Sequence, residues 1–397
     1  MKKMMFLGFI AFTALSVTSC SNDEVMEAVP QKQAIEFGTY LGRDAQARGT
    51  VLTTSNMVDF GVFAYYTGQN TWTASASVAT PNFMYNQKVN VAQPESPATE
   101  RTYSYSPLKY WPTTKDDKIS FFAYAPYVGT ENGALTVANG NTAKGLPQMN
   151  YTIKSSYLDK AEDFVVAVLV DEQKLTGNTL DNSDQTVSFN FKHVLTRVNI
   201  NAKLSKEVYN AATTGTNSEK KTKVNITKIE FSGNQLATKG LYTFSGVDGG
   251  VGTWEIIEKA NIDLDVLLKK VYASGLGDYT ESGVQVVNAT AVPVLSDNQY
   301  LYLIPIDGDG LDAITDEKMT VYYDIVTQDA ALSGGYSKTS AIKEIPLTAG
   351  QLKLGKAYLY TLIFGMNEVK LEVSSVEEWG NENEEPENVD WTDTDKS

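Results

Sequence analysis

The amino-acid sequence predicts an all-β protein with two β-sandwich domains in tandem, placed behind an N-terminal export signal. Three observations support this prediction. Short segments of alternating apolar and polar residues recur along the chain, as expected for half-buried strands. Clusters of Gly, Asn, Asp and Ser separate these segments and supply the turns. The chain has 397 residues, of which 42% are hydrophobic and 11% aromatic, so it is long and apolar enough to build two cores.

The export signal occupies residues 1–19. Two lysines supply the positive start, residues 4–15 form an apolar run, and small residues follow. The run is shorter than the roughly 20 apolar residues of a membrane-spanning helix. Residues 17–20 (VTSC) resemble a bacterial lipobox, whose cysteine becomes the acylated first residue of the mature protein. Because Cys20 is the only cysteine in the chain, we expect lipidation there rather than an ordinary signal peptide.

Residues 20–33 are predicted to form a lipidated tether. The acidic patch at residues 21–24 (SNDE) directly follows the cysteine. It resembles the signal that sends Bacteroidetes lipoproteins to the outer face of the outer membrane, and a plain solvated tether is the alternative. The expected location is therefore the surface of the cell outer membrane.

A half-buried strand is predicted over residues 34–41. Ile35, Phe37 and Leu41 share one face with Thr39, and the intervening residues share the other face. This is the first strand of the expected N-terminal domain.

The segment after that strand is a candidate protease site. Residues 43–49 (RDAQARG) are polar and contain Arg43 and Arg48. Exposed segments of small and polar residues are preferred sites of proteolytic nicking. An ordinary surface loop explains the same composition equally well.

Further strand patterns fill the rest of the chain. In order, they are residues 58–66, 118–125, 164–170, 186–204, 224–231, 240–244, 253–257, 299–306, 319–326, 357–364 and 368–373. The continuous apolar run at 164–170 is typical of a strand that is buried on both faces. One helix is predicted over residues 262–272 (IDLDVLLKKVY), with an acidic start and late lysines, and residues 206–223 are predicted to be a long polar loop.

These patterns divide the chain into two domains and a tail. The N-terminal sandwich is expected over residues 34–185 and the C-terminal sandwich over residues 186–380. Residues 381–397 are acidic and unpatterned, and we expect them to form a tail.

Composition excludes several classes of function. The formal net charge is −15, which disfavours nucleic acid as a partner. The only histidine, His193, lies inside a predicted strand, where a packed or hydrogen-bonded role is the usual one. Catalytic triads and most zinc sites use histidine, so both classes lose support. We therefore expect no enzymatic activity, no cofactor and no metal.

Two clusters leave alternatives open. Asp307, Asp309 and Asp312 could bind calcium, but an acidic hairpin turn is the better interpretation. The aromatic cluster consists of Tyr103, Tyr105, Tyr110 and Trp111. It could stack on sugars, although packing between strands is the commoner role of such residues.

Several segments, taken in order, resemble one known family. They are residues 35–37 with 47–50, then 60–65, 110–112, 119–124, 189–195, 355–361 and 376–380. This ordered set, behind a lipoprotein signal, resembles the Bacteroidales fimbrillins (Mfa-like, type V pilins). The resemblance implies two transthyretin-like β-sandwich domains. It also implies export as a lipoprotein and trimming by an arginine-specific protease, which removes the first strand and opens a groove for a strand of a neighbouring subunit.

Carried onto this sequence, the resemblance implies cleavage after Arg48, with Arg43 as second choice. The departing strand would be residues 34–41. The candidate donor strand carries Val369, Leu371 and Val373 at alternate positions. The alternative is that residues 368–373 are simply the last strand of their own domain.

The resulting hypothesis is a structural subunit of a cell-surface fimbria that polymerises by strand exchange and supports adhesion. Its expected partners are other fimbrial subunits, an arginine-specific protease and, before cleavage, the outer membrane. A fimbrial anchor or tip subunit is an alternative role. A monomeric surface lipoprotein that binds glycans is an alternative of another class, and a glycosidase with paired carboxylates is the weakest one.

Overall fold

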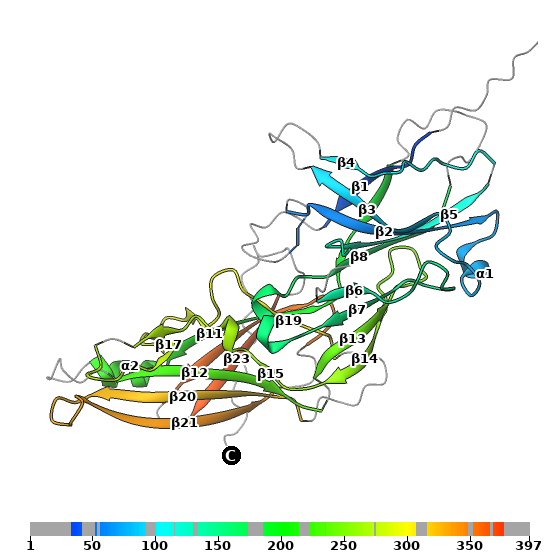
Figure 1. The fold of residues 1–397 in the computed structure, drawn as a ribbon. Coiled ribbons are helices and arrows are strands. Elements are labelled where there is room, and N and C mark those ends of the chain that lie inside the picture. The colour runs from blue at the N-terminus through cyan, green and yellow to red at the C-terminus, as the bar shows by residue number, and fades with distance from the viewer. Residues whose placement is uncertain are drawn as a thin grey trace, which may run out of the picture.

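The protein was analysed as a computed structural model. The structure describes residues 33–41, 52–53, 56–92, 101–114, 116–129, 134–173, 186–213, 222–234, 236–273, 275–306, 316–347, 352–365 and 368–376. Strands make up most of the regular secondary structure of these residues, which confirms the predicted all-β class. Figure 1 shows an elongated molecule, with β1 to β5 at one end and the hairpin of β20 and β21 at the other.

Within the described residues the strands form five sheets. Sheet A consists of the parallel strands β1 (Glu36–Tyr40) and β9 (Thr186–Asn190). Sheet B contains, in spatial order, β10 (Lys192–His193), β8 (Val165–Glu172), β5 (Lys118–Ala125), β2 (Asp59–Gly68), β3 (Met84–Ala92) and β4 (Thr102–Ser104). Sheet C contains β14 (Thr253–Lys259), β13 (Ala237–Thr243), β7 (Gln148–Thr152) and β6 (Leu135–Val137).

The other two sheets form the second half of the molecule. Sheet D contains β18 (Val292–Pro293), β11 (Thr196–Leu204), β22 (Ala357–Phe364) and β23 (Val369–Val376), with β19 (Leu301–Leu303) also paired to β11. Sheet E contains β16 (Val271–Tyr272), β17 (Ser282–Val286), β12 (Thr222–Ser232), β20 (Lys318–Gln328) and β21 (Tyr336–Pro346), with β15 (Ile262–Asp263) also paired to β12. The helical elements are α1 (Trp72–Ser75), α2 (Lys206–Thr213) and the 3-10 turns η1 (Ser155–Lys160) and η2 (Asp265–Leu267).

Sheet B is covered on both faces. Successive side chains of a strand point to opposite faces. Phe121 of β5 contacts Phe37 of sheet A, with ring centroids 6.2 Å apart. The next residue, Phe122, contacts Phe244 at the end of sheet C, at 6.0 Å. This arrangement explains the apolar run predicted at 164–170, because the first four residues of β8 are all buried.

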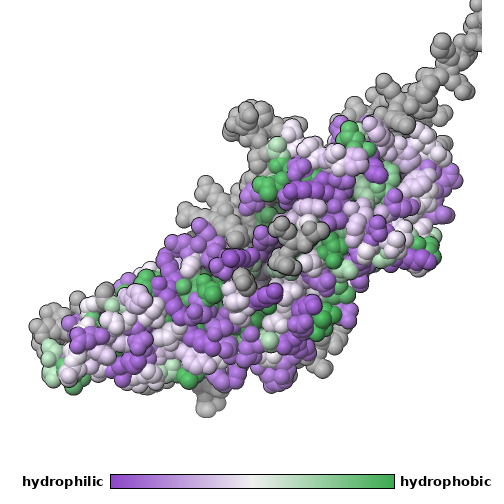
Figure 2. Space-filling view, viewed as in Figure 1, coloured by the Kyte–Doolittle hydropathy of each residue, from purple (hydrophilic) through white to green (hydrophobic). Residues whose placement is uncertain are grey.

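Sheets D and E form a second sandwich. Phe231 of β12 stacks on Tyr360 of β22 with centroids 6.4 Å apart, and Tyr323 of β20 meets Phe364 of β22 edge-on at 5.0 Å. These rings join one continuous core that also includes residues of sheets B and C. The face of the molecule seen in Figure 2 is polar over most of its area and carries small, separate apolar patches.

Sheet E contains a buried carboxylate. Asp324 on β20 accepts hydrogen bonds from the Tyr279 and Ser340 hydroxyls, each at 2.7 Å, and lies 3.4 Å from the Lys338 ammonium. Burial acts to raise the pKa of Asp324. The hydrogen bonds from Ser340 and Tyr279 and the charge of Lys338 outweigh it, so this pKa lies below its ordinary value.

Two predictions about local structure were wrong. Residues 262–272 are not a helix, because Ile262 and Asp263 pair with β12 and only η2 is helical. Ile262, Leu264 and Leu267 are each fully buried. Burial by tertiary packing therefore overrides the helical spacing of these residues. The predicted polar loop over residues 206–223 begins with α2 and ends in β12.

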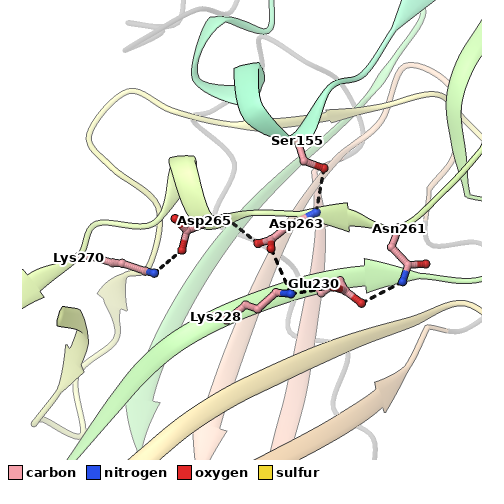
Figure 3. A network of polar contacts seen from close by, with 7 residues as sticks. All are labelled: Ser155, Lys228, Glu230, Asn261, Asp263, Asp265 and Lys270. Atoms are coloured by element: carbon pink, nitrogen blue, oxygen red, sulfur yellow. Dashed lines mark hydrogen bonds and ion pairs between the residues drawn. The ribbon is translucent and has the colours of Figure 1, made fainter. Parts of the chain in front are cut away.

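A polar network joins the two halves of the molecule (Figure 3). The Lys228 ammonium lies 3.0 Å from Glu230 and 3.1 Å from Asp263. The backbone N–H of Asp263 donates to the Ser155 hydroxyl of η1 at 3.1 Å. Hydrogen bonds to Glu230 and Asp263 raise the pKa of Lys228, so this cation stays charged. η1 is thereby tied to β15 and sheet E.

Strand pairing also crosses the predicted domain boundary. β6 and β7 precede residue 186, and they share sheet C with β13 and β14, which follow it. The division into two domains at this residue stays a prediction. In the part of the chain that the structure describes, no helix is both long enough and apolar enough to cross a bilayer.

Candidate functional site

The candidate site is the groove that β1 occupies. In the part of the chain that the structure describes, β1 pairs with β9 and with no other strand, in the register Glu36 to Thr186 through Tyr40 to Asn190. Just before the strand, an antiparallel bridge joins Ala34 to Tyr110. The chain thus pairs first with the segment around Tyr110 and then with β9.

The buried face of β1 is the one that the alternation predicts. Ile35, Phe37 and Leu41 are 1%, 3% and 4% exposed. On the opposite face Glu36 is exposed, and Tyr40 is 54% exposed. β1 therefore contributes side chains to the core between sheets A and B, and its removal would uncover their pockets.

Phe37 is the centre of an aromatic cluster. Its ring centroid lies 5.2 Å from that of Tyr105 and 5.6 Å from that of Phe189, which stacks on it. Phe60 and Phe121 meet it edge-on at 6.1 and 6.2 Å. These four rings come from β9, β2, β5 and the segment after β4, so Phe37 joins parts of the chain that are far apart in sequence.

Two tyrosine hydroxyls hold the edge of β1 that faces away from β9. The Tyr103 hydroxyl accepts a hydrogen bond from the backbone N–H of Thr39 at 3.1 Å and lies 3.0 Å from the Thr39 hydroxyl. The Tyr105 hydroxyl donates to the carbonyl of Ile35 at 2.9 Å. Burial raises the pKa of Tyr105, so its phenol keeps the proton that it donates.

The aromatic cluster noted in the sequence belongs to this groove. Tyr103 and Tyr105 pack against its core, and Trp111 is 4% exposed within it. Tyr110 is 43% exposed. Most of these rings are therefore engaged with β1 and the strands around it, and they do not form a free platform for sugars.

A buried carboxylate holds the chain at Leu52, which follows both β1 and the candidate cleavage residues in sequence. Asp163 accepts hydrogen bonds from the backbone N–H groups of Leu52, at 3.1 Å, and Phe164, at 2.8 Å. Its Oδ2 also lies 2.9 Å from Nδ1 of His193, and the side chains are 0% and 8% exposed. The single histidine is thus a partner of a buried carboxylate. No group of three or more His, Cys, Asp or Glu residues that could hold a metal occurs among the described residues.

A family model described as fimbrillin-like matches residues 47–379 of the chain. The chain belongs to the fimbrillin-like family. It is similar to Fimbrium subunit Fim1C of Phocaeicola vulgatus, at 31% identity over 402 residues, which cover 96% of this chain and 98% of that protein. The crystal structure of a fimbrial protein from Bacteroides vulgatus matches with a TM-score of 0.65 at 28% identity, covering 87% of this chain and 99% of that one.

In this fimbrillin the candidate donor segment is paired within its own sheet. β23 runs antiparallel to β22 from Val369 opposite Phe364 to Val376 opposite Ala357. Val369 is buried, and Leu371 and Val373 are partly buried against the core. β23 lies at the edge of sheet D, where one side of its backbone has no neighbouring strand among the described residues.

The other predicted sites of this fimbrillin lie outside the described residues. They are Cys20, Arg43, Arg48 and the carboxylates Asp307, Asp309 and Asp312. Sequence reasoning missed the roles of Tyr103, Tyr105 and Asp163. The clustering of aromatic residues near position 105 was a usable signal for the first two, whereas nothing in the sequence distinguishes Asp163 from other acidic residues.

Proposed function

We propose that this fimbrillin is a non-enzymatic structural subunit of a cell-surface fimbria, exported to the outer membrane as a lipoprotein through Cys20. Cleavage after Arg48 releases the segment that carries β1, and a strand of a neighbouring subunit then fills the groove. The observation that carries this proposal is β1 itself, which precedes Arg48 and completes a core built by strands that follow it. The relative named as a fimbrium subunit supports the same role.

The energetics favour refilling of the groove. Full burial of a large apolar side chain contributes roughly 1.5–3 kcal/mol, so loss of Ile35, Phe37 and Leu41 forfeits roughly 5–9 kcal/mol. Departure of β1 also exposes the backbone edge of β9. An unpaired edge of this kind accepts another strand, and main-chain hydrogen bonds then supply affinity.

The proposed donor is β23, because Val369, Leu371 and Val373 match the alternation of the departing strand. To donate, β23 must leave β22. Exchange is favourable where Leu371 and Val373, now partly buried, become fully buried in the neighbour's groove. Each subunit would then give one strand and accept one, and such a head-to-tail contact builds a filament that does not close.

The test is N-terminal sequencing and mass spectrometry of material sheared from the native cell surface. A mature chain that starts at Gly49 and runs as a high-mass ladder is expected. The substitution Arg48→Ala should abolish that product, with Arg43→Ala as the matched control. A chain that starts at lipidated Cys20 and occurs only as a monomer would overturn the proposal and favour an anchor subunit or a glycan-binding lipoprotein.

A further inference from the structure

We propose that the hydroxyls of Tyr103 and Tyr105 form a clasp that holds the strand in the groove by its backbone and sets how readily the strand leaves. The occupant that this clasp would receive after β1 is an extended strand from another subunit. The inference rests on the proposed function, because it names the contacts by which the groove retains its strand.

The first observation is that, among the described residues, β1 has a neighbouring strand on one side only. On the other side, just before the strand, the backbone N–H of Ile35 donates to the carbonyl of Lys109 at 2.9 Å. The carbonyl of Tyr40 points to the β9 side and accepts a hydrogen bond from the backbone N–H of Phe191, which directly follows β9, at 2.8 Å. The carbonyl of Ile35 and the N–H of Thr39 face the other edge, where the two tyrosine hydroxyls meet them. The hydroxyls therefore stand where a second neighbouring strand would supply its backbone groups.

The second observation is that both hydroxyls are held by their rings. The Tyr103 ring meets Phe60 edge-on, with centroids 6.4 Å apart, and the Tyr105 ring lies 5.2 Å from that of Phe37. Each ring is anchored in the core while its hydroxyl reaches the rim. The contacts are therefore positioned before any new strand arrives.

The chemistry of the contact suits an exchange of strands. Both hydroxyls bond to main-chain atoms, which every extended strand possesses. A phenol can donate one hydrogen bond and also accept, so it can hold either a carbonyl or an N–H group. Side-chain pockets of the groove then select the alternation of the incoming strand, while the clasp holds its backbone whatever the sequence.

The test uses hydrogen exchange on the full-length, uncleaved chain. The variants are Tyr103→Phe, Tyr105→Phe and both together, because phenylalanine keeps the ring and deletes only the hydroxyl. Tyr110→Phe is the control for an exposed tyrosine beside the groove. Tyr151→Phe is the control for a buried hydroxyl that donates to a backbone carbonyl elsewhere, that of Glu162 at 2.8 Å.

The amides of β1 that face β9 report departure of the whole strand. Their exchange should accelerate about fivefold for each single substitution and more than tenfold for the double one, since a net hydrogen bond is worth about 1 kcal/mol. Amides of β5 and β20 should keep their rates. Neither control should accelerate β1. Local opening of this kind is separable from global unfolding by its pattern of exchange.

Two results would overturn the clasp. In one, the only amide that accelerates is Thr39, which loses its own acceptor while the rest of β1 is unchanged. In the other, all strands accelerate together, so the hydroxyls merely stabilise the domain. The assay needs no cleavage, so it can support the clasp even where surface material starts at Cys20 and strand exchange is refuted.

Discussion

The substitution Phe37→Ala tests whether β1 is fastened by its central aromatic side chain. Phe37 is 3% exposed, and its ring meets four aromatic rings at 5.2 to 6.2 Å. Truncation of a buried phenylalanine to alanine destabilises by about 3–5 kcal/mol, from lost burial and from the cavity that remains. Aromatic pairs contribute about 0.5–1.5 kcal/mol beyond burial, so the upper part of that range is expected here.

The assay is urea denaturation of the full-length chain, with tryptophan fluorescence as the signal. Trp111 lies in the same core as Phe37 and reports its loss. With a slope of about 2 kcal/mol per molar urea, the midpoint should fall by about 2 M. The matched control is Tyr40→Ala, which removes an aromatic side chain from the exposed face of the same strand. Substitutions at such surface positions usually change stability by less than about 0.5 kcal/mol.

A loss below about 1 kcal/mol for Phe37→Ala, or an equal loss for Tyr40→Ala, would refute the reasoning. Either result would mean that β1 is not held by its buried face. The groove would then have no energetic reason to recruit a replacement strand.

Two further predictions concern buried carboxylates. Asp163→Ala should destabilise the protein by roughly 2–5 kcal/mol in thermal or urea melts, because it leaves the buried N–H of Phe164 and the partly buried N–H of Leu52 without an acceptor. The exposed Asp159→Ala is the control, and equal effects would contradict the prediction. For Asp324 the folded pKa lies below the unfolded one, so its contribution is fully present above about pH 4 and is lost as pH falls toward the folded pKa. In the variant Asp324→Asn, the free energy of unfolding should therefore fall less steeply as the pH drops below about 4. An unchanged dependence on pH would contradict this.

The sequence predicts β1 well because the signal is local. The alternation of Ile35, Phe37 and Leu41 over a few residues indicates both the strand and its buried face. The partner of β1 could not be predicted in the same way. β9 lies about 150 positions further along, and a parallel pairing leaves no turn signal from which register could be read. The clasp depends on the same distant folding, since Tyr103 meets Thr39 only after sheets A and B have packed.

At residues 262–272, where a helix was wrongly predicted, the local signal is present but misleading. The apolar residues there match helical spacing, but Ile262, Leu264 and Leu267 are buried through an irregular path of short strands and η2. Periodicity in a short segment is a weak signal once a neighbouring strand such as β12 offers pairing. The prediction failed where local preference and tertiary burial conflict.

The connection from β9 to β11 links the groove to the second sandwich. β9, β10 and β11 follow one another with only short breaks, and the unusually long alternation over residues 186–204 already indicates this continuity. β9 forms the groove beside β1, and β11 is paired to β22, the strand that holds β23. A strand seated in the groove is thus connected through few residues to the sheet that carries the proposed donor. In a filament built by exchange, β23 has left β22, so load on the accepted strand would pass along β9 and β11 to β22 and then through the chain that follows β22 to the donated strand. The connection from β9 to β11 is therefore where a subunit must be mechanically strong.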